Sequence, residues 1–219
     1  MLEAVLFDWN NTLVRLEWDD DRVLQGHRAA LGRDDPMFTE RWRAVMFGDH
    51  GYRPYAELLA ELGVDDPDAF IDAEHEVWRS AYAVLASAAA LLDSLHGRGL
   101  KTGLVANSWP DPGRVLRGDL EAFGLGARLD VAVFSDDVGV RKPDPAIFLH
   151  ACDALGISPA GALHVGDDLE KDVQGAAKVG MRTAQALWFR ADDTPAGVEP
   201  DVMAFTPMDV LNAARRLAR

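Results

Sequence analysis

Cysteine, positive charge and long apolar runs are all scarce in this sequence. Cys152 is its only cysteine, which excludes an intrachain disulfide, a cysteine-based zinc site and an iron–sulfur cluster, and which fits a reducing cytoplasm. The 36 acidic residues outnumber the 22 basic ones, and the net charge of −14 repels phosphate backbones and anionic lipids. We therefore expect a cytoplasmic protein with no nucleic-acid partner and no membrane partner.

The hydrophobic residues fall in short runs. The longest mainly apolar run, residues 81–92, contains Ser87 and stops at Asp93, well short of the roughly 18–20 residues that a membrane span needs. Residues 1–8 lack the basic head of a secretory signal and instead predict a strand. The 219 residues, 48% of them hydrophobic, can fill one domain or a core domain that carries an insertion.

Short apolar runs alternate with helical patterns over most of the chain. The runs predict strands at residues 4–7, 102–106, 131–134, 162–165 and 183–187, with a weaker one near 202–205. Apolar residues three and four positions apart predict helices at 112–123, 145–155, 169–179 and 208–217. This alternation is typical of a doubly wound α/β fold with a Rossmann-like parallel sheet.

One long segment interrupts the alternation. Between about residues 16 and 82 there is no convincing strand, only helical patterns near 21–31, 38–47, 54–62 and 68–82. The sequence therefore predicts two domains. Residues 1–15 and 86–219 would form the α/β core, and residues 16–85 would form an all-helical domain inserted after the first strand.

Polar side chains follow several of the predicted strands. The first strand is followed by Asp8, Asn10 and Asn11, the second by Asn107 and Ser108, and the fourth by Asp167, Asp168 and, one helical turn later, Asp172. Ligands of open α/β sheets bind at the carboxyl ends of the strands. There the acidic residues would hold a divalent cation, and Lys142 would face an anion. Because Mg²⁺ and lysine together neutralise a phosphoryl group, this set favours phosphoryl transfer.

Four segments carry a resemblance to a known family. Residues 6–13, LFDWNNTL, resemble a strand ending in Asp-x-Asp-x-Thr, and residues 103–108, GLVANS, resemble a strand ending in Ser or Thr. Residues 139–148, GVRKPDPAIF, and residues 164–173, HVGDDLEKDV, resemble a lysine motif and an acidic motif closely. In this order the four segments are similar to the motifs of the haloacid dehalogenase (HAD) superfamily of hydrolases. Members of this superfamily carry a helical cap at the position where this sequence has its helical insertion.

The resemblance implies a set of roles. Asp8 would be the nucleophile that attacks phosphorus and forms an aspartyl-phosphate, which water then hydrolyses. Mg²⁺ would be held by Asp8, the main-chain carbonyl of Asn10 and Asp167, with Asp172 supporting them. Lys142 would pair with Asp8 and the phosphoryl oxygens. The substrate would be a small phosphorylated metabolite, contacted around Trp9, Asn107 and Ser108.

Two positions depart from the family pattern. Its phosphatases have a second Asp where this chain has Asn10, and an amide cannot carry the proton between leaving group and water. Because a positioned acid–base group contributes roughly 10²–10⁴-fold, the change predicts a slow phosphatase, one restricted to good leaving groups, or none. The second departure is Ala106 in place of Ser or Thr, for which Asn107 or Ser108 could compensate.

Three rival functions follow from these departures. A HAD-like protein that has lost turnover and binds a phosphorylated ligand or a protein partner would explain Asn10 and Ala106. A haloacid dehalogenase also lacks the second Asp, but works without Mg²⁺ and does not need Asp167 and its acidic neighbours. A phosphonatase needs a cap lysine for its Schiff base, and no lysine precedes Lys101. The substrate's identity and the oligomeric state are left open.

Several polar residues have simpler interpretations. Asp168 can cap the following helix, and Asn11 is most simply a turn residue. His164 is expected near the end of a strand. We expect His27 and His75 at the surface.

Overall fold

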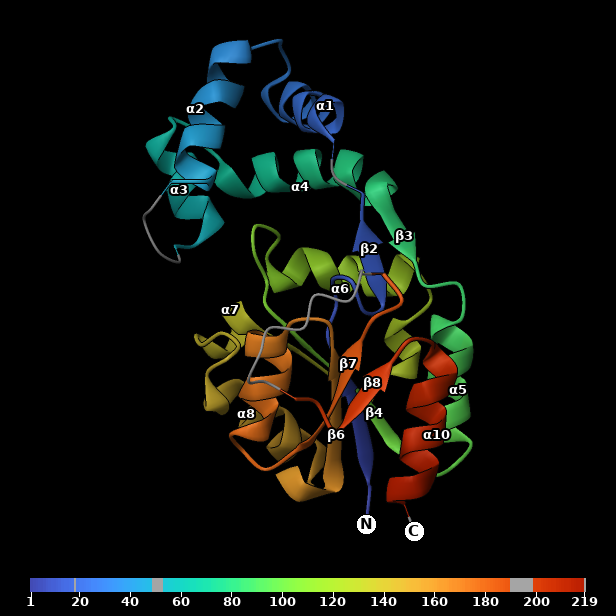
Figure 1. Ribbon diagram of the computed structural model, residues 1–219. Coiled ribbons are helices and arrows are strands. Elements are labelled where there is room, and N and C mark those ends of the chain that lie inside the picture. The colour runs from blue at the N-terminus through green and yellow to red at the C-terminus, as the bar shows by residue number, and fades with distance from the viewer. Residues whose placement is uncertain (18, 49–52, 190–198, 219) are drawn as a thin grey trace. The chain divides into compact units, whose positions relative to one another are not determined.

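The computed structural model describes residues 1–17, 19–48, 53–189 and 199–218. They divide into two compact units (Figure 1). Met1–Arg15, Val84–Asn107 and Leu120–Arg219 form the α/β unit, and Leu16–Ala83 with Ser108–Asp119 form the helical unit. The helical unit thus includes a segment after the second predicted strand, which the sequence placed in the α/β core.

A parallel sheet forms the centre of the α/β unit. Across the described residues its six strands lie in the order β5-β4-β1-β6-β7-β8. Their bounds are β1(Ala4–Phe7), β4(Lys101–Ala106), β5(Val131–Phe134), β6(Ala162–Gly166), β7(Arg182–Ala186) and β8(Val202–Ala204). The predicted doubly wound α/β fold is confirmed, and each predicted strand is present to within one residue at either end. In the register, Phe7 at the end of β1 pairs with Leu104 and with Val165.

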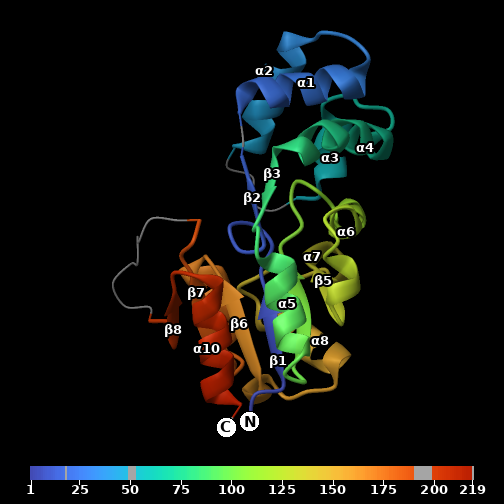
Figure 2. The ribbon, with the colours of Figure 1, turned by 90° about the vertical axis from the view of Figure 1, so that its right-hand side faces the viewer.

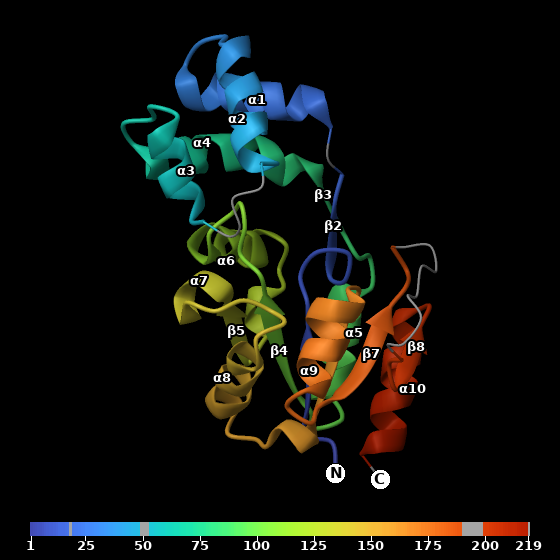
Figure 3. The same cartoon turned by 60° about the vertical axis from the view of Figure 1, so that its left-hand side comes forward.

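Helices cover both faces of this sheet. On one face, α5(Ala88–His96) and α10(Pro207–Leu217) pack against each other (Figure 2). On the other face lie α8(Pro145–Leu155) and α9(Gly175–Ala177), which follows the π-helix η4(Leu169–Gln174) (Figure 3). Shorter elements of the α/β unit are η2(Gly126–Arg128), α7(Ser135–Val138) and η3(Pro159–Gly161). The helix α6(Gly113–Ala122) begins in the helical unit and ends in the α/β unit. The buried side chains between sheet and α8 include Leu6, Val105, Ile147 and Phe148.

The helical unit contains α1(Asp20–Leu31), α2(Pro36–Met46), α3(Tyr55–Glu61), α4(Pro67–Trp78) and the short 3₁₀ helix η1(Arg79–Ala81). Asp19, Asp35 and Asp66 cap the amino ends of α1, α2 and α4. Aromatic and aliphatic side chains fill the core, and Val115 from the segment Ser108–Asp119 belongs to it.

Buried polar side chains distinguish the helical unit. His75 lies between the carboxylates of Asp111, at 2.9 Å, and Asp119, also at 2.9 Å, and Arg79 donates to Asp119 at 2.7 Å. His27 lies 3.0 Å from Glu74. Both histidines are buried, so the expectation that they lie at the surface was wrong. Their partners, which are distant in sequence, replace water around the imidazole rings.

Two short strands at the ends of the insertion were not predicted. β2(Val14–Leu16) and β3(Tyr82–Val84) pair with each other in a two-stranded sheet. Three residues are too few to show the alternation by which a strand is recognised. Within the described part of the chain, no helix has the length and apolar character needed to cross a membrane.

Candidate active site

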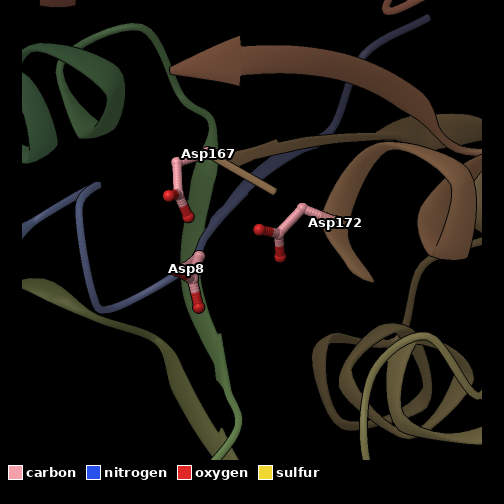
Figure 4. Close-up of side chains that lie close together, drawn as sticks. All are labelled: Asp8, Asp167 and Asp172. Carbon is pink, nitrogen blue, oxygen red and sulfur yellow. The ribbon is translucent and has the colours of Figure 1, made fainter. Parts of the chain in front are cut away.

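Three carboxylates meet at the carboxyl ends of β1 and β6. Asp8 follows β1, Asp167 follows β6, and Asp172 lies in η4. All three are buried, and one oxygen of each lies within 4.8 Å of an oxygen of the other two. Figure 4 shows the three side chains lying close together. The structure therefore brings together acidic residues that are up to 164 positions apart in the chain.

The main chain around Asp8 is firmly held. The Asp8 N–H donates to the carbonyl of Val165 at 2.9 Å, which continues the pairing of β1 with β6 beyond the strand. The carbonyl of Trp9 then accepts bonds from the N–H groups of Leu13 and Val14, at 3.0 and 3.1 Å. This tight turn reverses the chain directly after Asp8 and holds the main chain on which the Asp8 side chain stands.

Lys142 joins two of the carboxylates. Its buried Nζ donates to Asp8 Oδ1 at 2.5 Å and to Asp172 Oδ1 at 2.7 Å. Burial alone would lower the pKa of Lys142, but the two carboxylates reverse this and hold the pKa above its ordinary value. The amine is therefore a permanent positive charge at this end of the sheet.

Asp172 accepts hydrogen bonds on both of its oxygens. Oδ1 accepts from Lys142 and from His164 Nε2 at 3.0 Å, and Oδ2 accepts from the Asp168 N–H at 3.1 Å. Burial would raise the pKa of Asp172, but Lys142 and His164 bring it below its usual value. Gly166 completes this arrangement, because a Cβ at that position would collide with the Asp172 carboxyl group. Asp172 is thus a fixed anchor for the lysine.

Asp8 has the opposite electrostatic balance. Burial raises its pKa to about 7, and the Asp172 and Asp167 charges add to the rise, although Lys142 opposes it. A carboxyl group so placed becomes a full carboxylate when further positive charge arrives. Carboxylate oxygens are the ligands that Mg²⁺ prefers, and three of these groups meet here. A bound cation would also reduce the electrostatic repulsion among the three carboxylates. The residues at this site therefore fit a Mg²⁺ ion.

Comparison with known proteins identifies the family. Residues 2–180 match the haloacid dehalogenase-like hydrolases. The chain belongs to this family. It is 31% identical to the N-acetylmuramic acid 6-phosphate phosphatase of Pseudomonas aeruginosa over 98% of this chain and 96% of that protein. It is 28% identical to the glyceraldehyde 3-phosphate phosphatase of Methanopyrus kandleri, with 100% of both chains covered.

Solved structures show the same haloacid dehalogenase-like fold. The HAD phosphatase of Thermococcus onnurineus has a TM-score of 0.75 and 25% identity, with 97% of both chains covered. The 2-haloacid dehalogenase of Pseudomonas syringae has a TM-score of 0.68 and 23% identity, with 99% of both chains covered. The second likeness shows the fold alone.

Three residues predicted to contact substrate in this HAD-like hydrolase have structural partners. The Asn107 side-chain amide makes two hydrogen bonds to the main chain of Lys142. Its oxygen accepts from the Lys142 N–H at 2.8 Å, and its nitrogen donates to the Lys142 carbonyl at 3.1 Å. Ser108 is buried and begins the segment that belongs to the helical unit. The Trp9 indole is buried and stacks on Phe123, with ring centroids 6.2 Å apart. Asn107 therefore holds the lysine segment, and the Trp9 side chain packs the core.

The departures from the family pattern lie at the site itself. Asn10 is exposed and its main chain bridges to Val14. Ala106 is buried at the end of β4 and brings no hydroxyl group. Asp168 caps η4 through the Glu170 and Lys171 N–H groups, as the simpler interpretation of the sequence predicted.

Sequence reasoning missed two polar contacts of the site. Asn11 has φ 54°, in keeping with its predicted turn, but its amide also donates to Asp167 Oδ2 at 3.1 Å. His164 lies in β6, and its bond to Asp172 was not foreseen. The spacing of eight residues between His164 and Asp172 shows no metal-ligand pattern. Only the turn from β6 into η4 brings the two side chains together.

Proposed function

We propose that this protein is a Mg²⁺-dependent phosphatase of a small phosphorylated metabolite, with Asp8 as the nucleophile. The observation that carries the proposal is the pairing of a buried Asp8 with a buried, permanently charged Lys142 beside Asp167. The phosphatases of N-acetylmuramic acid 6-phosphate and glyceraldehyde 3-phosphate, both similar over nearly the whole chain, support a small phosphorylated substrate.

The chemistry takes place in two steps at one carboxylate. An oxygen of Asp8 attacks phosphorus, and the bond from phosphorus to the leaving oxygen breaks, which gives an aspartyl-phosphate. Water then attacks phosphorus, a proton passes to solvent, and Asp8 leaves as a carboxylate together with inorganic phosphate. Lys142 Nζ lies 2.5 Å from Asp8 Oδ1, close enough to offset negative charge on the phosphoryl oxygens.

The cation would be held by Asp8, Asp167 and the main-chain carbonyl of Asn10. Bound there, Mg²⁺ supplies Lewis-acid stabilisation of the phosphoryl group. We assign Asp172 to anchoring Lys142, because three donors already bind its two oxygens.

Asn10 limits the leaving group. An amide cannot donate a proton to the departing oxygen and recover it from water, so that oxygen must leave as an anion or take its proton from solvent. Phosphate esters of acidic alcohols and phenols should therefore react fastest.

The direct test is hydrolysis of an aryl phosphate by the full chain. We expect turnover with Mg²⁺ that is lost in EDTA, and a loss of at least about 10³-fold in Asp8→Asn, because an amide is not a nucleophile toward phosphorus. The matched control is Asp153→Asn, an exposed carboxylate of α8, which should keep full activity.

A second function is favoured by Asn10 and Ala106. If these two residues abolish useful catalytic turnover, the same site would serve only to bind a phosphorylated ligand. Binding of inorganic phosphate that needs Mg²⁺ and Lys142, without any hydrolysis of aryl phosphate, would support this alternative over the proposed phosphatase.

A further inference from the structure

Asn11 has an unusual backbone conformation. Throughout the described ranges it is the one non-glycine residue with positive φ, at 54°. Asparagine enters this left-handed region more easily than most residues do. The turn is supported on both sides, since the Trp9 carbonyl accepts the N–H of Leu13 and the Thr12 carbonyl accepts Trp188 Nε1 at 2.9 Å. The position of the Asn11 side chain is therefore well defined.

The Asn11 side chain links two loops of the site. Its Nδ2 donates to Asp167 Oδ2 at 3.1 Å, across 156 residues of sequence. The loops follow β1 and β6, which are neighbouring strands in register, with Phe7 beside Val165. A turn alone would need only a residue that tolerates positive φ, and glycine does this best. The amide adds a hydrogen bond that the turn itself does not require.

We infer that Asn11 is a positioning residue for Asp167, which orients this carboxylate for the cation. The inference rests on the proposed function, because Asp167 is there a ligand of Mg²⁺. With Oδ2 bonded to the Asn11 amide, rotation of the Asp167 carboxylate is restricted, which would orient this carboxylate for a cation. The amide is neutral, so it holds Asp167 without the positive charge that would compete with Mg²⁺.

The test measures Mg²⁺ affinity by calorimetry on the metal-stripped full chain. Asn11→Gly keeps the left-handed backbone and removes the amide, and Asn11→Ser keeps a side chain too short to reach Asp167. We expect both to weaken Mg²⁺ binding about 10-fold or more, the usual effect of losing a partner that orients a metal ligand. Asn212→Ser, at an exposed position of α10, is the matched control and should bind Mg²⁺ like the unmutated chain.

A second readout separates positioning from folding. In EDTA, the thermal midpoint and near-ultraviolet circular dichroism of Asn11→Gly should equal those of the unmutated chain. Equal Mg²⁺ affinity within twofold in both Asn11 variants would overturn the inference and leave the proposed function standing. Affinity lost only together with the metal-free fold would also overturn it. An unmutated chain that binds no Mg²⁺ would overturn both.

Discussion

In the proposed phosphatase, Asn10 restricts which phosphate esters the site would cleave. Asn10→Asp keeps the size of the side chain and restores a group that can carry a proton to the leaving oxygen. We predict a rise of about 10–100-fold in kcat, below the full range of acid–base catalysis because Ala106 still lacks a hydroxyl group. Steady-state rates on an aryl and an alkyl phosphate test this, with the larger gain expected for the alkyl ester.

The control for this change is the same substitution at Asn212, which is exposed on α10. Asn212→Asp adds the same negative charge at a position remote in sequence from Asn10, and it should leave both hydrolysis rates unchanged. A gain that is equal for both esters would contradict the proton-transfer explanation, since the better leaving group needs the proton less.

At the residue scale, the sequence predicted which charged side chains lie together but not all of the hydrogen bonds they make. Asp8 and Asp167 directly follow β1 and β6, and parallel strands place their carboxyl ends together. Lys142 lies farther along the chain, after α7, and was placed at the site by the family resemblance. The bond from Asn11 to Asp167 depends on the relative register of two strands, which no local pattern contains. For the same reason, the hydrogen bonds of Asn107 to the Lys142 main chain could not be predicted from the sequence.

The turn from β6 into η4 leaves no room for a side chain at Gly166. We predict that Gly166→Ala lowers kcat about 10²-fold, because the new methyl group displaces the Asp172 carboxyl group and with it Lys142. Gly118→Ala, in α6, has its nearest neighbouring atom 4.0 Å away and should keep full activity. Kinetics on an aryl phosphate compare the two. An active Gly166→Ala would show that Asp172 is not needed as an anchor.

The link between α4 and the segment Ser108–Asp119 should depend on pH. Burial would lower the pKa of His75, but Asp111 and Asp119 raise it to about 9, above the 6.5 of an unperturbed histidine. The stability from protonated His75 is therefore fully present below pH 6.5 and lost as the pH rises through 9. We predict a loss of up to about 3 kcal/mol in the free energy of unfolding. The groups around His75 are Asp111, Asp119, Arg79 and Tyr82.

Urea unfolding at pH 6 and pH 9.5 measures this effect. His75→Gln should flatten the dependence between the two values, and His150→Gln, at an exposed position of α8, should not. The same slope in His75→Gln as in the unmutated chain would assign the pH dependence to other groups.

The features that the sequence did not predict were missed for two different reasons. The strands of the α/β unit were found because most of them, such as β1 and β5, contain a short apolar run bounded by polar residues. The helix α5 begins with five apolar residues in a row, so it shows no three- and four-residue spacing. The contacts of Asp111 and Asp119 with His75 span 36 and 44 residues, so the sequence could not show that their segment belongs with the helices.

In the whole molecule, Mg²⁺ should act as a stabilising ligand. A cation that binds only the folded state at 100 times its dissociation constant adds about 2.7 kcal/mol to the free energy of unfolding. We predict that Mg²⁺ raises the thermal midpoint of the unmutated chain and that EDTA reverses the change. Asp167→Asn should fold normally and show no rise, as differential scanning calorimetry can check. A rise of the same size in Asp167→Asn would place the bound cation elsewhere.

The discontinuity of the helical unit also sets an order of events during synthesis. Its core includes Val115, and its buried His75 needs Asp111 and Asp119. A nascent chain that has left the ribosome only as far as residue 85 has made α1 to α4, yet their polar interior is still incomplete. The helices must wait for 34 more residues, among them β4, before His75 gains its carboxylates. The helical unit therefore cannot be completed before β4 has been synthesised, although each unit has its own core.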